Sequence, residues 1–217
     1  KTTSEGTLLS FVVAGSDADE PAQTLTYSLE AAPPGASINP ATGVFSWTPS
    51  EAQGPGVYSV TIVVADSSTP SLNAAETISI TVGEVNSPPV LVTIGSKSVN
   101  EGATLAFTAS AADPDLPAQA LTFSLDAGAP AGAAINPATG AFTWTPTEAD
   151  GPGTFNVTVR VTDAGGASDF ETVSVTVNEV NTAPVLAAIG NKSVDEAQAL
   201  TFTAAAADSD TPTQALT

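Results

Sequence analysis

The 217-residue chain contains no cysteine, no methionine and no histidine. These absences exclude disulfide bonds, thiolate and imidazole chemistry, and the usual zinc ligands. Only four residues are basic against 23 acidic ones, which gives a formal net charge of -19 at pH 7. Such an imbalance opposes binding to nucleic-acid phosphates or anionic lipid. No apolar run approaches the roughly 20 residues that a membrane-spanning helix needs, so we expect no membrane insertion of this segment.

The residues that are present indicate a folded core. Hydrophobic residues make up 42% of the chain and charged residues only 12%, unlike an acidic disordered tail. Alanine, threonine, serine, valine, glycine and proline dominate, a composition typical of a secreted, repetitive β-protein. The carboxylates should repel one another in a folded chain unless a cation neutralises them.

Two motifs recur along the chain. The segment Ile38–Pro49, with the sequence Ile-Asn-Pro-Ala-Thr-Gly-Val-Phe-Ser-Trp-Thr-Pro, returns almost unchanged as Ile135–Pro146. The segment Glu-Val-Asn-Ser-Pro-Pro-Val at 84–90 returns as Glu-Val-Asn-Thr-Ala-Pro-Val at 179–185. Each copy of this second motif follows an alternating strand pattern and has proline before its last residue, and proline marks a strand end. We interpret both copies as joints between repeats.

The joints predict three parts of the chain. The first repeat is predicted at 1–86, the second at 87–181, and the start of a third at 182–217. Lys1 corresponds to Lys97, so the first repeat begins after its own start, and the third stops before its second half. Repeat arrays rarely end without caps, so we expect this segment to continue into further copies on both sides.

Apolar residues alternate with small or polar residues within each repeat, the pattern of half-buried β-strands. The alternation is clearest after the two Gly-Pro-Gly sequences, at Tyr58, Val60, Ile62 and Val64 and at Phe155, Val157, Val159 and Val161. About seven short strands per repeat, frequent turns and no helical period predict an all-β fold of tandem Greek-key β-sandwiches.

Asn-Pro-Ala-Thr-Gly is predicted to be a turn, in which Gly43 and Gly140 adopt positive φ. Trp47 and Trp144 follow this turn on the same strand face as a phenylalanine. An exposed pair would suggest a sugar-stacking platform, but an aromatic residue that recurs at an inward strand position favours the core.

The chain resembles the dystroglycan-type cadherin-like and bacterial Ig-like tandem repeats of large surface proteins. The motif Asn-Pro-x-Thr-Gly-x-Phe-x-Trp-Thr-Pro, the strand that ends at Asp66 or Asp163, and the Val-Asn-x-x-Pro-Val joint carry this resemblance. In cadherins, calcium lies at the joint and is held by acidic groups of both neighbouring domains. The resemblance therefore implies an extracellular, cell-surface protein whose joints bind Ca²⁺.

Candidate ligands are the acidic and amide residues that match the cadherin positions. Calcium takes six to eight oxygen ligands in flexible geometry, whereas Mg²⁺ requires strict octahedral geometry. Ser87 and Thr182 stand where cadherins often carry a further carboxylate, so fewer or weaker ions are implied. A lone Asp-x-Asp is usually a turn, but here it recurs in register. The ligands implied for the first joint are Glu5, Glu51, Glu84, Asn86, Asp113, Asp115 and Asp163; those for the second are Glu101, Glu148, Asp150, Glu179, Asn181, Asp208 and Asp210.

We do not expect an enzyme. Paired carboxylates can hydrolyse glycosides, but these acids recur in every repeat, and the chain lacks a nucleophile elbow or phosphate loop. The leading hypothesis is a calcium-stiffened stalk of a large cell-surface adhesin or matrix protein, whose partners are neighbouring repeats of the same chain. The alternatives are a self-assembling subunit of an extracellular filament or sheath, and a module that binds a cell-surface glycan or protein without structural calcium.

Overall fold

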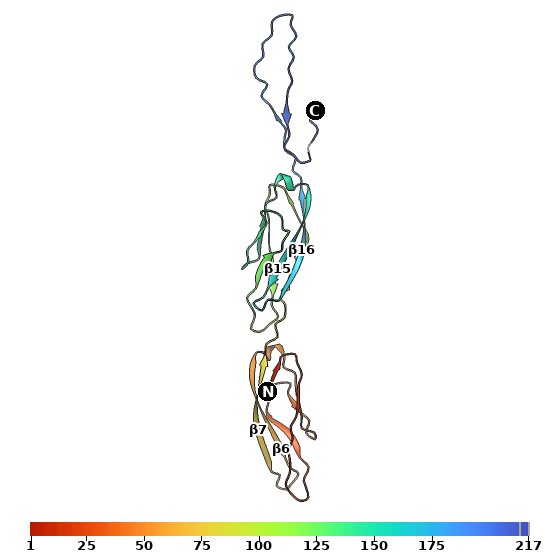
Figure 1. Ribbon diagram of the computed structural model, residues 1–217, viewed down its shortest axis with the longest axis vertical. Coiled ribbons are helices and arrows are strands. Elements are labelled where there is room, and N and C mark those ends of the chain that lie inside the picture. Colours follow the sequence, from red (N-terminus) through yellow and green to blue (C-terminus); the bar gives the residue numbers. More distant parts are fainter. Residues whose placement is uncertain (213, 217) are drawn as a thin grey trace. The chain divides into compact units, whose positions relative to one another are not determined.

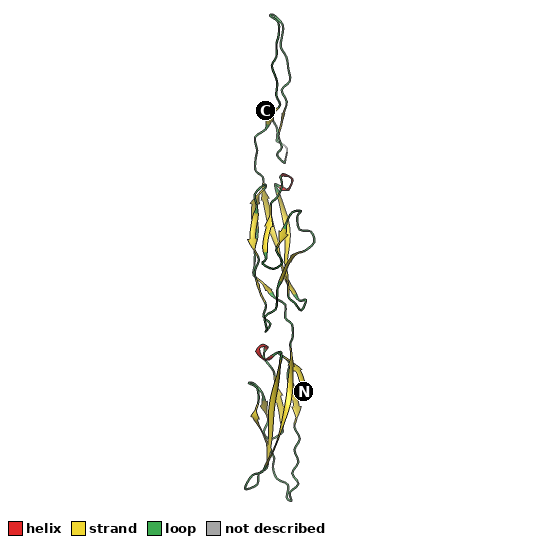
Figure 2. Cartoon of the chain, turned by 90° about the vertical axis from the view of Figure 1, so that its left-hand side faces the viewer, coloured by secondary structure: helices red, strands yellow, loops and turns green. Residues whose placement is uncertain are grey.

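The computed structural model describes residues 1–212 and 214–216 of the chain. Nearly all of the regular structure is β-strand, interrupted by two short 3₁₀ turns, η1 (Glu51–Gln53) and η2 (Glu148–Asp150) (Figure 2). The predicted all-β fold is therefore confirmed.

The chain forms two compact units. Unit 1 comprises Lys1–Ser87 together with Pro114–Gln119, and unit 2 comprises Pro88–Asp113 together with Ala120–Thr217. The short segment Pro114–Gln119 is thus part of unit 1, although the sequence repeat assigns it to the second copy. The three repeat boundaries expected from the sequence stay a prediction.

Unit 1 is built from two sheets. β6 (Gly56–Ala65) and β7 (Asn73–Gly83) pair antiparallel from Gly56↔Val82 to Ala65↔Asn73, and β1 (Thr2–Ser4) lies parallel to β7 on its other side (Figure 1). The four-stranded sheet has the order β1 (Thr2–Ser4), β7 (Asn73–Gly83), β6 (Gly56–Ala65), β3 (Thr26–Ala31). The three-stranded sheet has the order β2 (Leu9–Val12), β5 (Val44–Trp47), β4 (Ser37–Ile38). These seven strands match the predicted number.

Unit 2 repeats this arrangement and adds two short ladders. Its four-stranded sheet has the order β12 (Thr122–Leu125), β15 (Gly153–Thr162), β16 (Ser168–Asn178), β9 (Lys97–Asn100). Its three-stranded sheet has the order β10 (Leu105–Thr108), β14 (Ala141–Trp144), β13 (Ala134–Ile135). The ladders pair β8 (Val90–Leu91) with β11 (Ala111–Ala112), and β17 (Val185–Leu186) with β18 (Ala206–Ala207).

The core of each unit surrounds the recurring tryptophan. Trp47 and Trp144 are each 1% exposed, which confirms that they are core residues and not a sugar platform. Each indole Nε1 donates to a backbone carbonyl, of Pro34 at 3.2 Å and of Ala131 at 3.1 Å. The polar atom of each buried ring is therefore satisfied, and the rest of the ring fills the space between the two sheets.

The predicted Asn-Pro-Ala-Thr-Gly turn is confirmed. Asn39 Oδ1 accepts the amides of Ala41 and Thr42, each at 3.0 Å, and Gly43 adopts φ +66°. A Cβ on Gly43 would also collide with the Val13 carbonyl oxygen. Gly140 repeats this geometry in unit 2 with φ +69°. Only glycine meets both conditions, and the turn leads directly into β5, on which Phe45 and Trp47 are the two buried residues.

Candidate metal centre

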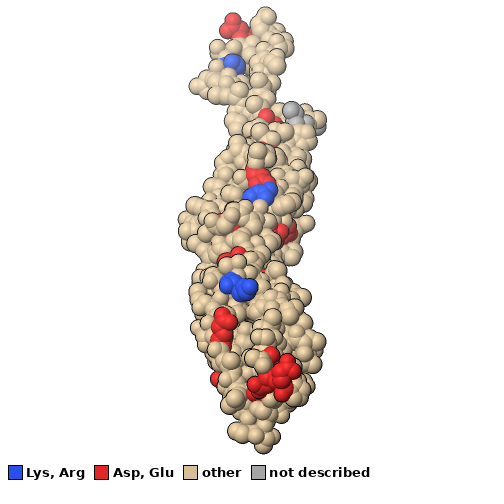
Figure 3. All heavy atoms as spheres, turned by 60° about the horizontal axis from the view of Figure 1, so that its bottom comes forward, with Lys and Arg blue, Asp and Glu red and all other residues tan. Residues whose placement is uncertain are grey.

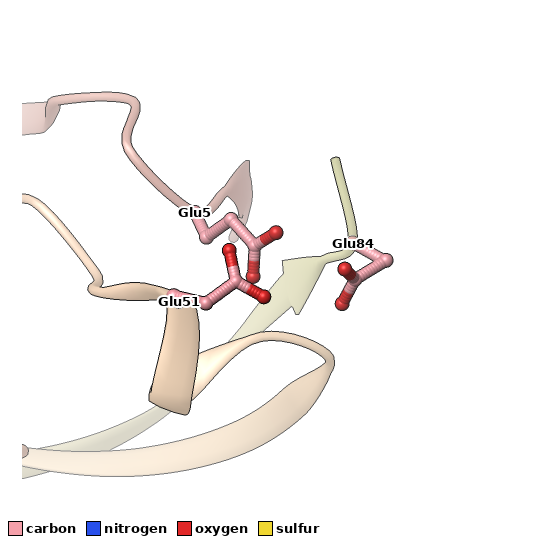
Figure 4. A group of neighbouring side chains, drawn as sticks. All are labelled: Glu5, Glu51 and Glu84. Carbon is pink, nitrogen blue, oxygen red and sulfur yellow. The ribbon is translucent and has the colours of Figure 1, made fainter. Parts of the chain in front are cut away.

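Three glutamates of unit 1 converge at one end of its sheets. Glu5, Glu51 and Glu84 each offer a carboxylate oxygen, and these oxygens lie within 4.8 Å of one another (Figure 4). Glu5 follows β1 and Glu84 follows β7, while Glu51 begins the turn η1. Because β1 runs parallel to β7 and Ser4 pairs with Gly83, the two strands deliver Glu5 and Glu84 to the same sheet end.

Unit 2 assembles the same group from the same elements. Carboxylate oxygens of Glu101, Glu148 and Glu179 also lie within 4.8 Å of one another. β9 runs parallel to β16, and the pairing of Asn100 with Asn178 places the following Glu101 and Glu179 together. The convergence is therefore a property of the fold of the repeat.

A glycine makes room for the most buried carboxylate of each group. Glu5 is only 6% exposed, and its Oε2 lies where a Cβ on Gly54 would have to be. Its Oε1 accepts the Val85 amide at 2.9 Å, whereas Oε2 has no hydrogen-bond partner within the described part of the chain. A buried carboxylate oxygen without a donor is costly unless a cation lies beside it.

The second repeat shows the same pairing of glutamate and glycine. Glu101 is 8% exposed, its Oε2 occupies the Cβ space of Gly151, and its Oε1 accepts the Val180 amide at 2.9 Å. Oε2 of Glu101 and both carboxylate oxygens of Glu179 are buried and have no hydrogen-bond partner among residues 1–212 and 214–216. The orphaned Oε2 thus recurs at Glu5 and Glu101, whereas the buried oxygens of Glu179 have no equivalent at the exposed Glu84.

A fourth acid completes the group in unit 1. Asp115 is 1% exposed, and its two carboxylate oxygens accept the Ser87 amide, each at 3.1 Å. The neighbouring Leu116 amide donates to Glu51 Oε1 at 2.8 Å. Desolvation raises the pKa of Glu84, and the nearby charges of Glu5, Glu51 and Asp115 raise it further, although Glu84 as a whole residue is exposed. We call Glu5, Glu51, Glu84 and Asp115 the first acidic cluster.

The corresponding acid in unit 2 is Asp210. It is 3% exposed and accepts the Thr182 amide at 3.2 and 3.0 Å, while the Thr211 amide donates to Glu148 Oε1 at 2.9 Å. Desolvation raises the pKa of Glu179, followed by the charges of Glu101, Glu148 and Asp210. We call Glu101, Glu148, Glu179 and Asp210 the second acidic cluster.

Other predicted ligands have hydrogen bonds near the clusters. Asn86 Oδ1 accepts a hydrogen bond from Gln119 Nε2, and Asn181 Oδ1 accepts one from Gln214 Nε2 at 2.5 Å. Asp150 caps η2, where its Oδ2 accepts the Thr147 amide at 2.8 Å. Amide and carboxylate oxygens are of the kind that a hard metal ion binds.

Three predicted aspartates lie outside these groups of glutamates. Asp208 Oδ1 accepts the Asp210 amide at 3.0 Å and so orients the second acidic cluster. Asp163 is 6% exposed, and its Oδ1 accepts the Ala167 amide at 2.9 Å in the turn that joins β15 to β16. Asp113 directly follows β11. Asp113 and Asp163 both belong to unit 2, so their expected role at the first joint stays a prediction.

Sequence reasoning missed two features of the clusters. Gly54 and Gly151 provide the space for the buried carboxylate, and Ser87 and Thr182 provide the amides that hold Asp115 and Asp210. The Gly-Pro-Gly sequence occurs at the same position of both repeats, and this recurrence could have identified Gly54 and Gly151 as structurally important. No sequence pattern could have identified the amide donors, because every residue except proline carries a backbone amide.

The donor set suits a hard divalent cation. Carboxylate and amide oxygens are ligands of Ca²⁺, and no sulfur or imidazole is present in the chain to favour a softer metal. Basic residues are sparse on the face seen in Figure 3. Arg160 pairs with Asp126 at 2.7 Å, and Lys97 Nζ donates to the Ile94 carbonyl, so both are engaged elsewhere. The orphaned oxygens of Glu5, Glu101 and Glu179 fit a bound cation.

Comparison with known proteins agrees with this fold. The family model described as "Putative Ig domain" matches residues 1–83 and 88–178. The chain therefore belongs to the putative Ig domain family, as a tandem of Ig-like repeats. None of the curated proteins matches the chain. No helix within the described residues is long and apolar enough to cross a membrane.

Several solved structures of cadherin extracellular repeats share the fold. Human CDH23 EC21-23 matches with a TM-score of 0.60 and 20% identity, over 97% of this chain and 82% of that one. Mouse Cadherin-23 EC22-24 matches with a TM-score of 0.56 and 21% identity, over 84% of this chain and 64% of that one. The protocadherin GammaB4 extracellular domain matches with a TM-score of 0.51 and 21% identity, over 87% of this chain and 34% of that one.

Proposed function

We propose that this chain is a calcium-stiffened spacer of an extracellular surface or matrix protein, of the dystroglycan-type cadherin-like kind. The observation that carries the proposal is the buried, unpartnered Oε2 of Glu5 and of Glu101, each beside further carboxylates in the same position of its repeat. Four acidic groups without a cation repel one another at the effective dielectric of a protein surface. A divalent ion converts this repulsion into attraction.

The origin of the ligands explains how an ion would stiffen the chain. The first acidic cluster takes Glu5, Glu51 and Glu84 from the first sequence repeat, and Asp115 from the second. An ion held by both sets restrains the connecting residues Val85–Pro89, whose backbone is otherwise in no strand. The second acidic cluster likewise combines three glutamates with Asp210 of the third repeat. The role is structural, so we propose no catalytic activity for either cluster.

Calcium titration by calorimetry tests this proposal. The chain should bind Ca²⁺ in preference to Mg²⁺, with a melting temperature that is higher in Ca²⁺ than in chelator. Glu5→Gln and Glu101→Gln should each weaken binding at their own cluster. Glu30→Gln, which changes an exposed glutamate outside both clusters, is the matched control and should leave binding unchanged. Equal calcium binding by all four proteins would contradict the assignment of the ligands.

Small-angle scattering tests the mechanical part separately. If bound calcium restrains the connecting segments, the maximum dimension of the 217-residue chain should be larger and better defined in Ca²⁺ than in chelator. The double variant Glu5→Gln, Glu101→Gln should behave in Ca²⁺ as the unaltered chain behaves in chelator. Calcium binding without any change in scattering would leave the clusters as metal sites but remove the stiffening role.

A further inference from the structure

Three side chains form a row across the outer face of the four-stranded sheet of unit 2. Phe170 on β16 lies directly opposite Arg160 on β15, and Arg160 lies opposite Ser124 on β12 (Figure 1). Asp126 directly follows β12, and its amide donates to the Thr158 carbonyl at 3.0 Å, so it lies beside the same part of β15. We call Asp126, Arg160 and Phe170 the cross-strand row.

The contacts within the row hold it in one geometry. Arg160 Nε and Nη2 donate to the two carboxylate oxygens of Asp126 at 2.8 and 2.7 Å, and Nη1 donates to Ser168 Oγ at 3.0 Å. The guanidinium carbon Cζ lies 5.0 Å from the centroid of the Phe170 ring, within the range of a cation–π contact. A guanidinium that is paired and stacked in this way loses little freedom when a ligand binds, so the row is preorganised.

The row is also open to solvent. Phe170 is 55% exposed, and the side chains of Arg160 and Asp126 are each 32% exposed. A guanidinium has five N–H groups, of which three donate in the bonds above within the described part of the chain, and the two oxygens of a carboxylate accept roughly four hydrogen bonds. Donors, acceptors and an apolar ring are therefore presented side by side, as in sites that orient a ligand through a few polar groups.

Unit 1 builds the same sheet without this row. Its strands β6 and β7 pair Val63 with Ala75 at the position where unit 2 pairs Arg160 with Phe170. The fold of the repeat therefore requires neither a guanidinium nor an aromatic ring here. An exposed ion pair contributes little to folding stability, so stability alone does not explain why unit 2 has the row.

The surrounding face favours one class of ligand. Apart from the row, every outward-facing residue of β15 and β16 is threonine, serine or asparagine. Beside the row, the hydroxyl groups of Thr158 and Thr172 are hydrogen-bonded at 2.9 Å. The charges of Arg160 and Asp126 pair with each other, and the net charge of -19 on the chain repels anions. A neutral face of hydroxyl and amide groups around one ring suits an uncharged ligand that has both hydroxyl groups and an apolar face.

We propose that this face binds a neutral, β-linked polysaccharide through the cross-strand row. A β-linked pyranose carries its hydroxyl groups around the edge of the ring and presents axial C–H groups on its faces. These C–H groups carry a slight positive charge and stack on the negative face of an aromatic ring. One sugar stacks on the exposed side of Phe170, while its hydroxyl groups donate to Asp126 and accept from Arg160. Thr172, two residues further along β16, bonds to a neighbouring sugar.

The proposal goes beyond the spacer function and is independent of calcium. None of the residues of the cross-strand row belongs to either acidic cluster. Polysaccharide binding should therefore be the same in calcium and in chelator, whereas the proposed stiffening requires calcium. The two proposals can fail separately.

Native gel electrophoresis through soluble polysaccharides tests the proposal. The neutral probes are hydroxyethyl cellulose, mixed-linkage β-glucan and galactomannan, and carboxymethyl cellulose is the anionic counterpart of the first. At least one neutral polymer should retard the unaltered chain, and carboxymethyl cellulose should retard it less than hydroxyethyl cellulose does. Phe170→Ala should weaken binding by about tenfold or more, and Arg160→Lys, which keeps the charge but not the fork, should weaken it severalfold.

Val57→Ala is the matched control, because it removes a 71% exposed apolar side chain from the same sheet face of unit 1. This variant should be retarded like the unaltered chain. Circular dichroism should show the same β-structure for all variants, since Phe170 is exposed. The proposal would be overturned if no neutral polymer retards the chain, or if Phe170→Ala leaves the retardation unchanged. Binding that requires calcium, or that is stronger for carboxymethyl cellulose than for hydroxyethyl cellulose, would also overturn it.

Discussion

The Oε2 oxygen of Glu5 lies in the space that a Cβ on Gly54 would occupy, and Glu101 has the same relationship to Gly151. The glycines are therefore required by a side chain that comes from another strand, and not by their own backbone conformation, since neither has a positive φ. The absence of a side chain at these two positions is what admits a buried carboxylate to each cluster.

Gly151→Ala should displace Glu101 from the second acidic cluster. Overpacking a filled site typically costs about 1–3 kcal/mol of unfolding free energy, and displacing a ligand through its neighbour typically costs roughly 10- to 100-fold in metal affinity. Chemical denaturation and calcium calorimetry measure the two effects. Gly83→Ala is the control, because the nearest atom to its Cβ would be Ser4 Oγ at an ordinary 3.6 Å. Unchanged calcium binding in Gly151→Ala would contradict the placement of the ion.

Glu179→Gln should have opposite effects with and without calcium. In chelator, the variant removes a charge that is desolvated and repelled by Glu101, Glu148 and Asp210, so its melting temperature should rise by a few degrees. In calcium it loses a charged ligand, so its affinity should fall by about tenfold. Calorimetry and thermal melts in both buffers provide the comparison. A lower melting temperature in chelator would show that the cluster is not under repulsive strain.

Stability without divalent cations should depend on pH in two windows. The pKa values of Glu84 and Glu179 are raised above their ordinary 4.5, so the folded chain takes up these protons before the unfolded chain does. Stability should therefore increase as the pH falls from 7 toward the ordinary pKa of 4.5. Thermal melts across this range in chelator measure the effect, and calcium should abolish it.

A second, opposite window lies at lower pH. Hydrogen bonds from Ser68 lower the pKa of Asp66, and hydrogen bonds from Arg160 lower that of Asp126, both below the ordinary 3.8. These carboxylates stabilise the folded state while ionised, so that stability is lost as the pH falls below 3.8 through their folded pKa values. A maximum of stability between the two windows is the expected signature, and stability that falls steadily from pH 7 would contradict it.

Glu171→Ala should release Pro89–Ser96, whose Leu91 and Ile94 pack on the core of unit 2. It removes both acceptors of the Ile94 and Gly95 amides, and a lost buried partner costs about 1–3 kcal/mol. Hydrogen exchange at Ile94 and Gly95 should accelerate far more than exchange in β15 and β16. Glu76→Ala, the same change at the counterpart in unit 1, is the control and should alter stability less, because Glu76 is exposed. Unchanged protection of Ile94 in Glu171→Ala would show that the carboxylate does not hold the segment.

Phe45→Ala should destabilise unit 1 through its core. Phe45 is 0% exposed and stacks on Phe11 with ring centroids 4.8 Å apart, so its removal should cost about 3–5 kcal/mol. In a Trp144→Phe background, Trp47 fluorescence reports the unfolding of unit 1 by denaturant. Val57→Ala, at a 71% exposed position, should change stability by less than about 0.5 kcal/mol. A small effect of Phe45→Ala would indicate that the core repacks around the cavity.

Local patterns were sufficient to predict most of the fold. Alternation along β6 and β15 identified the long strands, and the Asn-Pro-Ala-Thr-Gly motif identified the turn at Gly43, because both depend on residues next to one another in the chain. The inward position of Trp47 followed from the same alternation. These predictions are confirmed by burial and backbone geometry.

The candidate site was predictable only in part. Glu5, Glu51 and Glu84 were expected together, and the structure brings them together. That expectation depended on resemblance, because the parallel pairing of β1 with β7 joins residues about 80 positions apart and leaves no local pattern. Whether the clusters hold calcium stays a prediction.

The sequence by itself determined the repeat, the strands, the turns and the excess of acid, because each is a property of neighbouring residues or of composition. Only the tertiary structure decided which carboxylates lose their solvent and their partners, and which segment packs over the core of unit 2. Burial and pairing arise between segments far apart in the chain, and alternation along one strand cannot specify which distant segment will cover it.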